Sequence, residues 1–472
     1  MRTHAAPGGR PFAAARSAIR RRWPLAAARS GIRPRRPFAA ARTGVRPRRP
    51  LAAARTGIRR RPSVAAGSLA GLLCTLLAGC GGGTTKAGTP TPTPSPRATA
   101  APADSDLTQL ERLMQRRAAA LAAGRPPAYA ATATGPQRDR DREAARNARG
   151  LGLRDVELAV GSTDLSGRRA TLRVRAVYGV RGVRGRFGTA RRITARRTAA
   201  GWRVVRESGP RERHPWELGR VQARRSRHFV VLAPSGLELG VLVDALERGY
   251  ARMGDVLDRP RLRRRYLVVV AGGAQAARAL TESIRGVESL AAISDTEVRE
   301  TGSARRVTEV VSQRLVVVWP AFSGLDAGGR LRVVTHELTH AALAGVTSGR
   351  TPAWLVEGIA LYVSEDRRID EAAQLRVRGD LPSLRSLSRP DTIARLSGAP
   401  QAAAYATASA ASFYLVERFG RRRFLRLVRS FSDESLRGRP GAAVTRRAVR
   451  RVLGVSLPRL ERDLRDWVTS AL

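Results

Sequence analysis

The chain has 472 residues, 43% of them hydrophobic, which is enough for two or three domains of ordinary size. Its formal net charge of +49 would favour anionic partners such as lipid head groups, wall polymers or nucleic acid. The chain carries no zinc-finger spacing and no ribonucleoprotein aromatic motif, so nucleic acid is not an expected partner. Its two cysteines, Cys74 and Cys80, lie close together near the N-terminus, which excludes a disulfide framework and a cysteine-ligated metal in the rest of the chain.

Residues 11–62 repeat with a period of 13, as in "PLAAARSGIRPRR" and "PFAAARTGVRPRR". A solenoid needs repeats that bury a continuous core, whereas these units are short, rich in arginine and interrupted by proline. The segment 1–62 is therefore expected to be disordered low-complexity chain.

An apolar run follows, "SVAAGSLAGLLCTLLAGC", residues 63–80. Its length after a basic region is typical of a signal-peptide core, since a membrane span needs about 20 residues. The end, Leu77 to Cys80, resembles the bacterial lipobox, in which a small residue precedes a cysteine that is lipidated. This resemblance implies a protein anchored through a lipid at Cys80 on the extracytoplasmic face of the bacterial cell membrane. An uncleaved anchor helix is the alternative, and it would also leave the body outside the membrane.

Residues 81–104 are rich in Gly, Thr and Pro and are expected to form an extended tether. A first domain is expected over 105–215. Ser105 or Asp106 can cap a helix that Gly124 ends. The apolar residues of this helix fall on one stripe: Leu107, Leu110, Leu113, Met114 and Leu121.

The sequence pattern in the rest of this domain predicts antiparallel strands. Val156, Leu158 and Val160 alternate with polar residues, as do Leu172, Val174 and Ala176. Ile193 and then Trp202 and Val204 flank "TAAG", a hairpin turn. This order of elements resembles the cone-shaped nuclear-transport-factor-like (SnoaL-like) fold. No catalytic cluster is visible here, so a spacer or binding role is expected.

A second domain is expected over 225–472. "HFVVL" and "RRYLVVV" predict buried strands around a helix at about 236–257, and "RRVTEVV" and "RLVVVWP" predict two further strands over 305–320. Helical periodicity dominates from about residue 401. The fold class is therefore α+β: a small cone-like domain of helix and antiparallel sheet, followed by a domain with a small sheet and a helical C-terminal body.

The stretch "VVTHELTH", residues 333–340, carries a metal-ligand spacing. His336 and His340 are four residues apart, which is about 400° of rotation on a helix, so both imidazoles face one side and can hold zinc. Glu337 is turned about 100° away and is better placed to act as a general base on zinc-bound water. The alternative is that these histidines only cap or pack the helix.

No third histidine follows, so a carboxylate must complete the site, and Glu357 in "PAWLVEGIA" is the best candidate. Pro352 sits near the start of its helix, and Gly358 and Ala360 permit close helix contact. "THELTHAAL" with "PAWLVEGIALYV" resembles the gluzincins of the peptidase MA-like superfamily. The resemblance implies a zincin-like fold, the Zn²⁺ ligands His336, His340 and Glu357, and the base Glu337.

Tyr405 could reach the site to stabilise a developing oxyanion, although a half-buried packing role is the alternative. Tyr362 is a second candidate that is expected to pack. Some gluzincins have an aspartate four residues beyond the ligand glutamate to support a histidine, but Leu361 occupies that position here, so a backbone carbonyl is one expected substitute. The strand 314–320 is expected to be an edge that aligns an extended peptide.

These features together predict a lipid-anchored zinc metallopeptidase acting on a peptide or protein substrate. The alternative belongs to another class: a catalytically inactive zincin-fold surface protein that binds anionic wall or membrane polymers. The intact Glu337 favours the enzyme, because a metal scaffold alone needs no general base.

Overall fold

The computed structural model describes residues 19–26, 105–208, 212–257, 262–281, 290–302, 305–436 and 438–470, with the backbone alone for 19–26. These residues belong to one compact unit. The apolar run with Cys80 and the linker 81–104 lie outside them. Within the described part, no helix combines the length and the apolar character that a membrane span requires.

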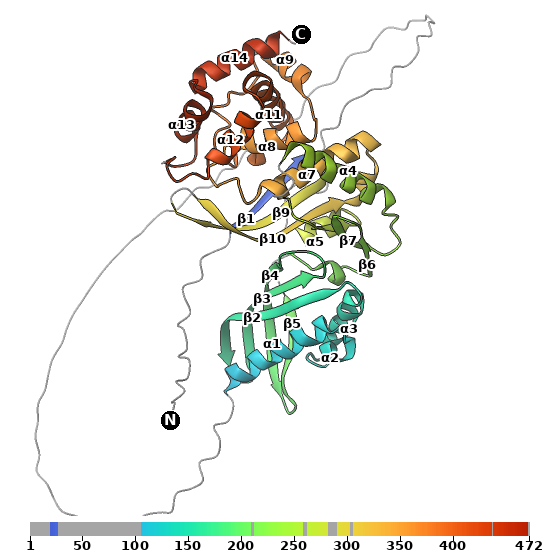
Figure 1. Cartoon of the computed structure of the whole chain (residues 1–472). Helices are drawn as coiled ribbons and strands as arrows, with labels where there is room; N and C mark the ends of the chain where they lie inside the picture. Colours follow the sequence, from blue (N-terminus) through green and yellow to red (C-terminus); the bar gives the residue numbers. More distant parts are fainter. Residues whose placement is uncertain are drawn as a thin grey trace, which may run out of the picture. The chain divides into compact units, whose positions relative to one another are not determined.

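The first part is a four-stranded antiparallel sheet in the order β2-β3-β4-β5, preceded by three helices (Figure 1). Their bounds are α1 (Asp106–Ala122), α2 (Pro126–Ala130), α3 (Pro136–Ala148), β2 (Leu153–Ser166), β3 (Arg169–Val180), β4 (Phe187–Thr198) and β5 (Gly201–Ser208). The predicted hairpin is confirmed, because Thr198 pairs with Gly201 across the turn.

Helix α1 begins where the sequence predicts. The Ser105 hydroxyl accepts a hydrogen bond from the Thr108 N–H at 3.3 Å, which satisfies one of the free amides of the first turn. Leu113 and Met114 are buried against the sheet, beside Trp202 of β5. Leu107 of the predicted stripe is 51% exposed.

The second part contains a six-stranded mixed sheet in the order β1-β9-β10-β8-β7-β6. The strands are β1 (Ile19–Ala26), β6 (Val221–Arg225), β7 (Phe229–Pro234), β8 (Tyr266–Ala271), β9 (Leu290–Thr301) and β10 (Arg306–Val318). β8 pairs in parallel with β7 and with β10, whereas β9 is antiparallel to β10. The predicted helix near 236–257 is α4 (Gly240–Val256).

Three expectations about this sheet are wrong. β10 is one strand rather than two, because its register shifts at two irregularities without a turn. β10 also lies between β8 and β9, so it is not an edge. Finally, the repeat segment expected to be disordered contributes β1, which pairs with β9. β9 itself was not predicted, because Asp295, Thr296 and Glu297 interrupt its apolar pattern.

Both faces of the six-stranded sheet are covered, which explains its continuous apolar runs. Phe229 and Val231 face a cluster that includes residues of α4 and of the helical body. Val230 and Leu232 alternate with them and join Tyr178 and other residues of the first part. The two sheets therefore share a hydrophobic core.

The described residues also form eleven further helical segments. They are η1 (Pro215–Glu217), α5 (Ala274–Leu280), α6 (Trp319–Ser323), α7 (Ala327–Leu343), α8 (Ala353–Val363), α9 (Ile369–Val377), α10 (Thr392–Arg395), α11 (Gly398–Phe419), α12 (Arg421–Ser430), α13 (Ala442–Leu453) and α14 (Leu457–Thr469). The expected α+β class, with a helical C-terminal body, is confirmed.

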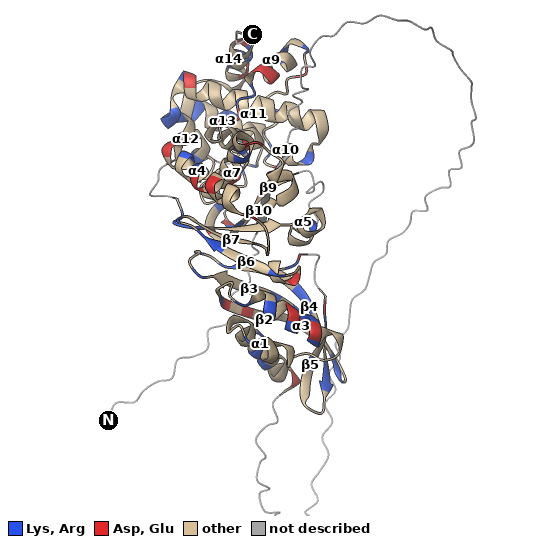
Figure 2. Cartoon of the chain, turned by 90° about the vertical axis from the view of Figure 1, so that its right-hand side faces the viewer, with Lys and Arg blue, Asp and Glu red and all other residues tan. Residues whose placement is uncertain are grey.

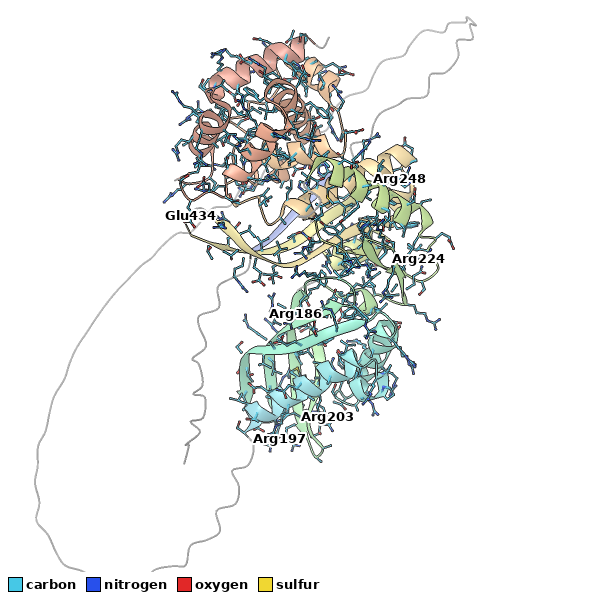
Figure 3. The ribbon with its side chains drawn as sticks, viewed as in Figure 1. Arg186, Arg197, Arg203, Arg224, Arg248 and Glu434 are labelled. Atoms are coloured by element: carbon cyan, nitrogen blue, oxygen red, sulfur yellow. The ribbon has the colours of Figure 1, made fainter. Side chains whose placement is uncertain are left out.

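Basic side chains are spread over both parts of the described chain (Figure 2). Arg197 and Arg203 lie on neighbouring strands of the first sheet, whereas Arg224 lies on β6 and Arg248 on α4 (Figure 3). The positive charge is therefore carried by many elements.

Candidate functional site

Helix α7 carries the first motif. It begins after Asp326, whose carboxylate accepts a hydrogen bond from the Gly329 N–H at 2.5 Å. His336, Glu337 and His340 are all buried, in a helix that packs against α4, α8 and β9. The sequence folds this way because the apolar residues around the motif belong to the core. They include Val333, Val334, Leu338 and Ala341.

Helix α8 brings the second motif to the first. It begins after Pro352, as predicted, and carries Glu357. The predicted role of Gly358 in close helix contact is confirmed: a Cβ there would lie 2.1 Å from Ser412 Oγ and 2.6 Å from the Ala408 carbonyl oxygen. Glycine therefore permits α8 to approach α11 closely at the residue next to the predicted ligand.

Three side chains of these helices converge on one point. The Nε2 atoms of His336 and His340 lie 3.0 Å apart. Glu357 Oε2 lies 3.3 Å from the first of these atoms and 3.5 Å from the second. The three ligand atoms lie within 4.8 Å of one another, so this group could hold a metal ion.

Burial and their mutual interactions shift the pKa values of two of these groups. Burial lowers the pKa of His336, and the neighbouring His340 lowers it further, although Glu357 opposes both effects. Burial would raise the pKa of Glu357, but the two histidines outweigh it and lower that pKa to about 2. A neutral imidazole and an ionised carboxylate are the forms that bind a metal ion.

Glu337 lies beside this group and is held by the neighbouring strand. Its Oε2 accepts a hydrogen bond of 2.6 Å from the Ser294 N–H of β9, and the side chain is fully buried. A main-chain donor fixes this carboxylate more firmly than a mobile side chain would. Sequence reasoning missed Ser294, because nothing in a sequence identifies a backbone donor on a strand that was itself not predicted.

Tyr405 lies on α11 and is buried. Burial raises its pKa well above the ordinary value, and the charges of Glu357 and Glu337 raise it further, whereas Arg368 lowers it. The Arg368 guanidinium carbon lies 5.6 Å from the centroid of the Tyr405 ring. The phenol is therefore a neutral donor in the electrostatic field of both glutamates.

Two other predicted neighbours take different roles. The Tyr362 ring packs against Phe413 and Phe424, with centroid distances of 5.2 and 5.7 Å. Leu361 is fully buried in the apolar core. His336 Nδ1 has no hydrogen-bond partner among the described residues, so no carbonyl supports this ring there.

A charged cluster in the first part was also missed. A cavity of about 830 Å³ is lined by Tyr129, Asp141, Arg191 and Glu207, among others. Asp141 and Glu207 both pair with Arg117, which is fully buried. The position of Arg117 could have indicated this cluster, because it lies four residues after Leu113 on the buried stripe of α1.

His214 lies just before η1. It is buried, and its ring stacks on Trp216 with centroids 4.8 Å apart. His228, which had no expected role, bonds Glu247 through Nδ1 at 2.5 Å. His4 lies outside the described residues.

No protein-family model matches the chain, and no curated protein matches it either. One similar solved structure is an NTF2-like protein with a cystatin-like fold from Novosphingobium aromaticivorans, at 22% identity and a TM-score of 0.19. The likeness covers 22% of this chain and 79% of that chain.

Two other similar structures are mutant M1 zinc metallopeptidases. One, from Deinococcus radiodurans and bound to a Tyr-Ser-Ala substrate, is 18% identical with a TM-score of 0.32. A two-domain enzyme bound to L-tryptophan is 17% identical with a TM-score of 0.31. Each likeness covers 67% of this chain and 61% of the other, so this chain spans about three fifths of those enzymes. At these TM-scores the functional interpretation depends on the residues of the site.

Proposed function

We propose that this protein is a zinc-dependent peptidase. The observation that supports this proposal is the convergence of His336, His340 and Glu357 on one buried point, with the carboxylate of Glu337 fixed beside it. Two imidazoles and one carboxylate are a common ligand set of catalytic zinc, which keeps one further position open.

The distances between the three ligand atoms fit zinc. In a tetrahedral zinc site with metal–ligand distances of about 2.0–2.1 Å, two ligand atoms lie about 3.3 Å apart. The observed separations of 3.0, 3.3 and 3.5 Å bracket this value. Without a shared cation, the 3.0 Å contact between two imidazole nitrogens needs a proton on one of them, and that nitrogen then has no lone pair to offer.

Zinc would supply Lewis acidity and would lower the pKa of a coordinated water. Glu337 would take a proton through Oε1 and pass it to the leaving amine, while the Ser294 N–H holds Oε2 in place. Tyr405, kept protonated by burial, would donate its hydroxyl proton in a hydrogen bond to the developing oxyanion.

The test combines metal analysis with hydrolysis of unstructured casein by the processed chain that begins at Cys80. We expect one zinc per chain in the wild type, loss of zinc in Glu357→Ala, and casein cleavage that a chelator stops. Glu309→Ala is the matched control, because Glu309 is an exposed glutamate of β10 that pairs with Arg299. A well-folded wild type that binds no zinc would contradict the proposal.

The proposed place of action is the extracytoplasmic face of the membrane, with a lipid anchor at Cys80. This part of the proposal is supported by the sequence of residues 77–80. Radiolabelled palmitate should label the wild type and not Cys80→Ala. Anionic wall polymers are proposed as additional contacts of the basic surface, and their binding should weaken as salt is raised.

A further inference from the structure

The strand next to the candidate site is not free. β1 pairs antiparallel with β9, from Ile19 opposite Val298 to Pro24 opposite Ile293, and a register shift precedes the pair of Ala26 and Leu290. Without β1, β9 would form the edge of the six-stranded sheet. Figure 1 shows β1 alongside β9, below α7.

The register places β1 at the proposed catalytic base. Trp23 lies opposite Ser294, and the Ser294 N–H donates to Glu337 Oε2. β1 therefore runs along the strand that carries the main-chain contact to the base. An extended peptide that added to β9 would need the same row of backbone N–H and C=O groups.

The sequence explains why this repeat unit pairs. Residues 19–26 read "IRRRWPLA", with five residues before the first proline. The equivalent residues of the next two units, 32–39 and 45–52, read "IRPRRPFA" and "VRPRRPLA", with a proline at the third position. Proline cannot donate to a ladder, so the first unit offers the longest run of backbone donors.

We propose that residues 19–26 occupy the edge of β9 as an internal inhibitory strand that keeps extended peptides away from the candidate site. This inference rests on the proposed peptidase function. Cleavage at the lipobox before Cys80 would remove β1 with the rest of the N-terminal segment and leave the edge of β9 open. The unprocessed chain is thus closed to peptide, and processing opens it.

The test uses the full chain with Cys80→Ala, which keeps the N-terminal segment attached. Arg21→Pro with Arg22→Pro removes two consecutive N–H groups, one of which must face β9 because donors alternate along a strand. Arg21→Gln with Arg22→Gln removes the same charges and keeps both N–H groups. Two readouts are compared: hydrogen exchange of the β9 amides, and binding of a fluorescein-labelled peptide with the sequence of residues 19–26.

We expect the β9 amides that face β1 to exchange at least about tenfold faster in the proline variant than in the glutamine variant. The β9 amides that face β10 should be unchanged. The labelled peptide should bind the proline variant at least about tenfold more tightly than the Cys80→Ala parent chain. Equal exchange in both variants would overturn the pairing, and faster exchange without tighter peptide binding would overturn the inhibition. Neither readout needs hydrolysis, so an inactive protein would count against the peptidase proposal alone.

Discussion

The Ser294 N–H donates a hydrogen bond of 2.6 Å to Glu337 Oε2, and this contact joins β9 to α7 at the centre of the candidate site. The donor belongs to the main chain of a strand that is paired with β10, so its position is fixed by the sheet. This contact involves none of the three proposed metal ligands. Orientation of the base and binding of the metal are therefore separable.

Replacing Glu337 by glutamine should separate them in experiment. The amide oxygen of glutamine can still accept from the Ser294 N–H, but the side chain no longer takes up a proton. We expect Glu337→Gln to keep one zinc per chain and to lose casein hydrolysis by about 10²–10⁴-fold. Glu309→Gln is the control for a lost surface charge. Hydrolysis that persists in Glu337→Gln would contradict the role of Glu337 as the general base.

Gly358 should tolerate no side chain. Its Cβ would meet Ser412 Oγ at 2.1 Å and the Ala408 carbonyl oxygen at 2.6 Å, and the carbonyl cannot rotate away. We expect Gly358→Ala to lower the free energy of unfolding by about 1–3 kcal/mol and to weaken zinc binding, because α8 carries Glu357. Urea denaturation and metal analysis measure the two effects.

The matched control for that substitution is Gly345→Ala, where the nearest atom to a Cβ is Val310 Cγ2 at 3.7 Å. Ser412→Ala added to Gly358→Ala should restore little, since the Ala408 carbonyl still obstructs the new methyl group. Full recovery in that double variant would show that only the hydroxyl matters.

The local part of the site could be predicted from the sequence, because helical spacing alone places His336 and His340 on one side. The approach of Glu357 was also predicted, since its glycine neighbour indicates a close helix contact. The hydrogen bond from Ser294 could not be predicted, because it depends on the long-range pairing of a strand with polar residues. The charged cluster around Arg117 was missed for a similar reason: its partners are 24 and 90 residues away.

The buried ion pair of Arg117 and Asp141 should show strong non-additivity. Asp141→Asn leaves a fully buried guanidinium with less compensation, so we expect a loss of about 3–5 kcal/mol in the free energy of unfolding. Arg117→Met with Asp141→Leu removes both charges and should cost less than Asp141→Asn alone. Urea denaturation of all the variants measures the coupling. The coupling would be contradicted if the double variant lost as much free energy of unfolding as Arg117→Met and Asp141→Leu lose together when made singly.

The last prediction concerns pH and His214. Burial lowers the pKa of His214 well below its ordinary value, and the nearby charges of Arg191 and Arg314 lower it further. The unfolded chain therefore binds a proton at about pH 6.5 that the folded chain does not. The corresponding stability is present above that pH and is lost as the pH falls below it, by about 1.4 kcal/mol per pH unit for one group. Urea unfolding at pH 7.0 and 5.5, followed by tryptophan fluorescence, should show this loss in the wild type. His214→Phe keeps a ring that can stack on Trp216 and should reduce the difference. An equal pH dependence in both proteins would mean that folding does not lower the pKa of His214.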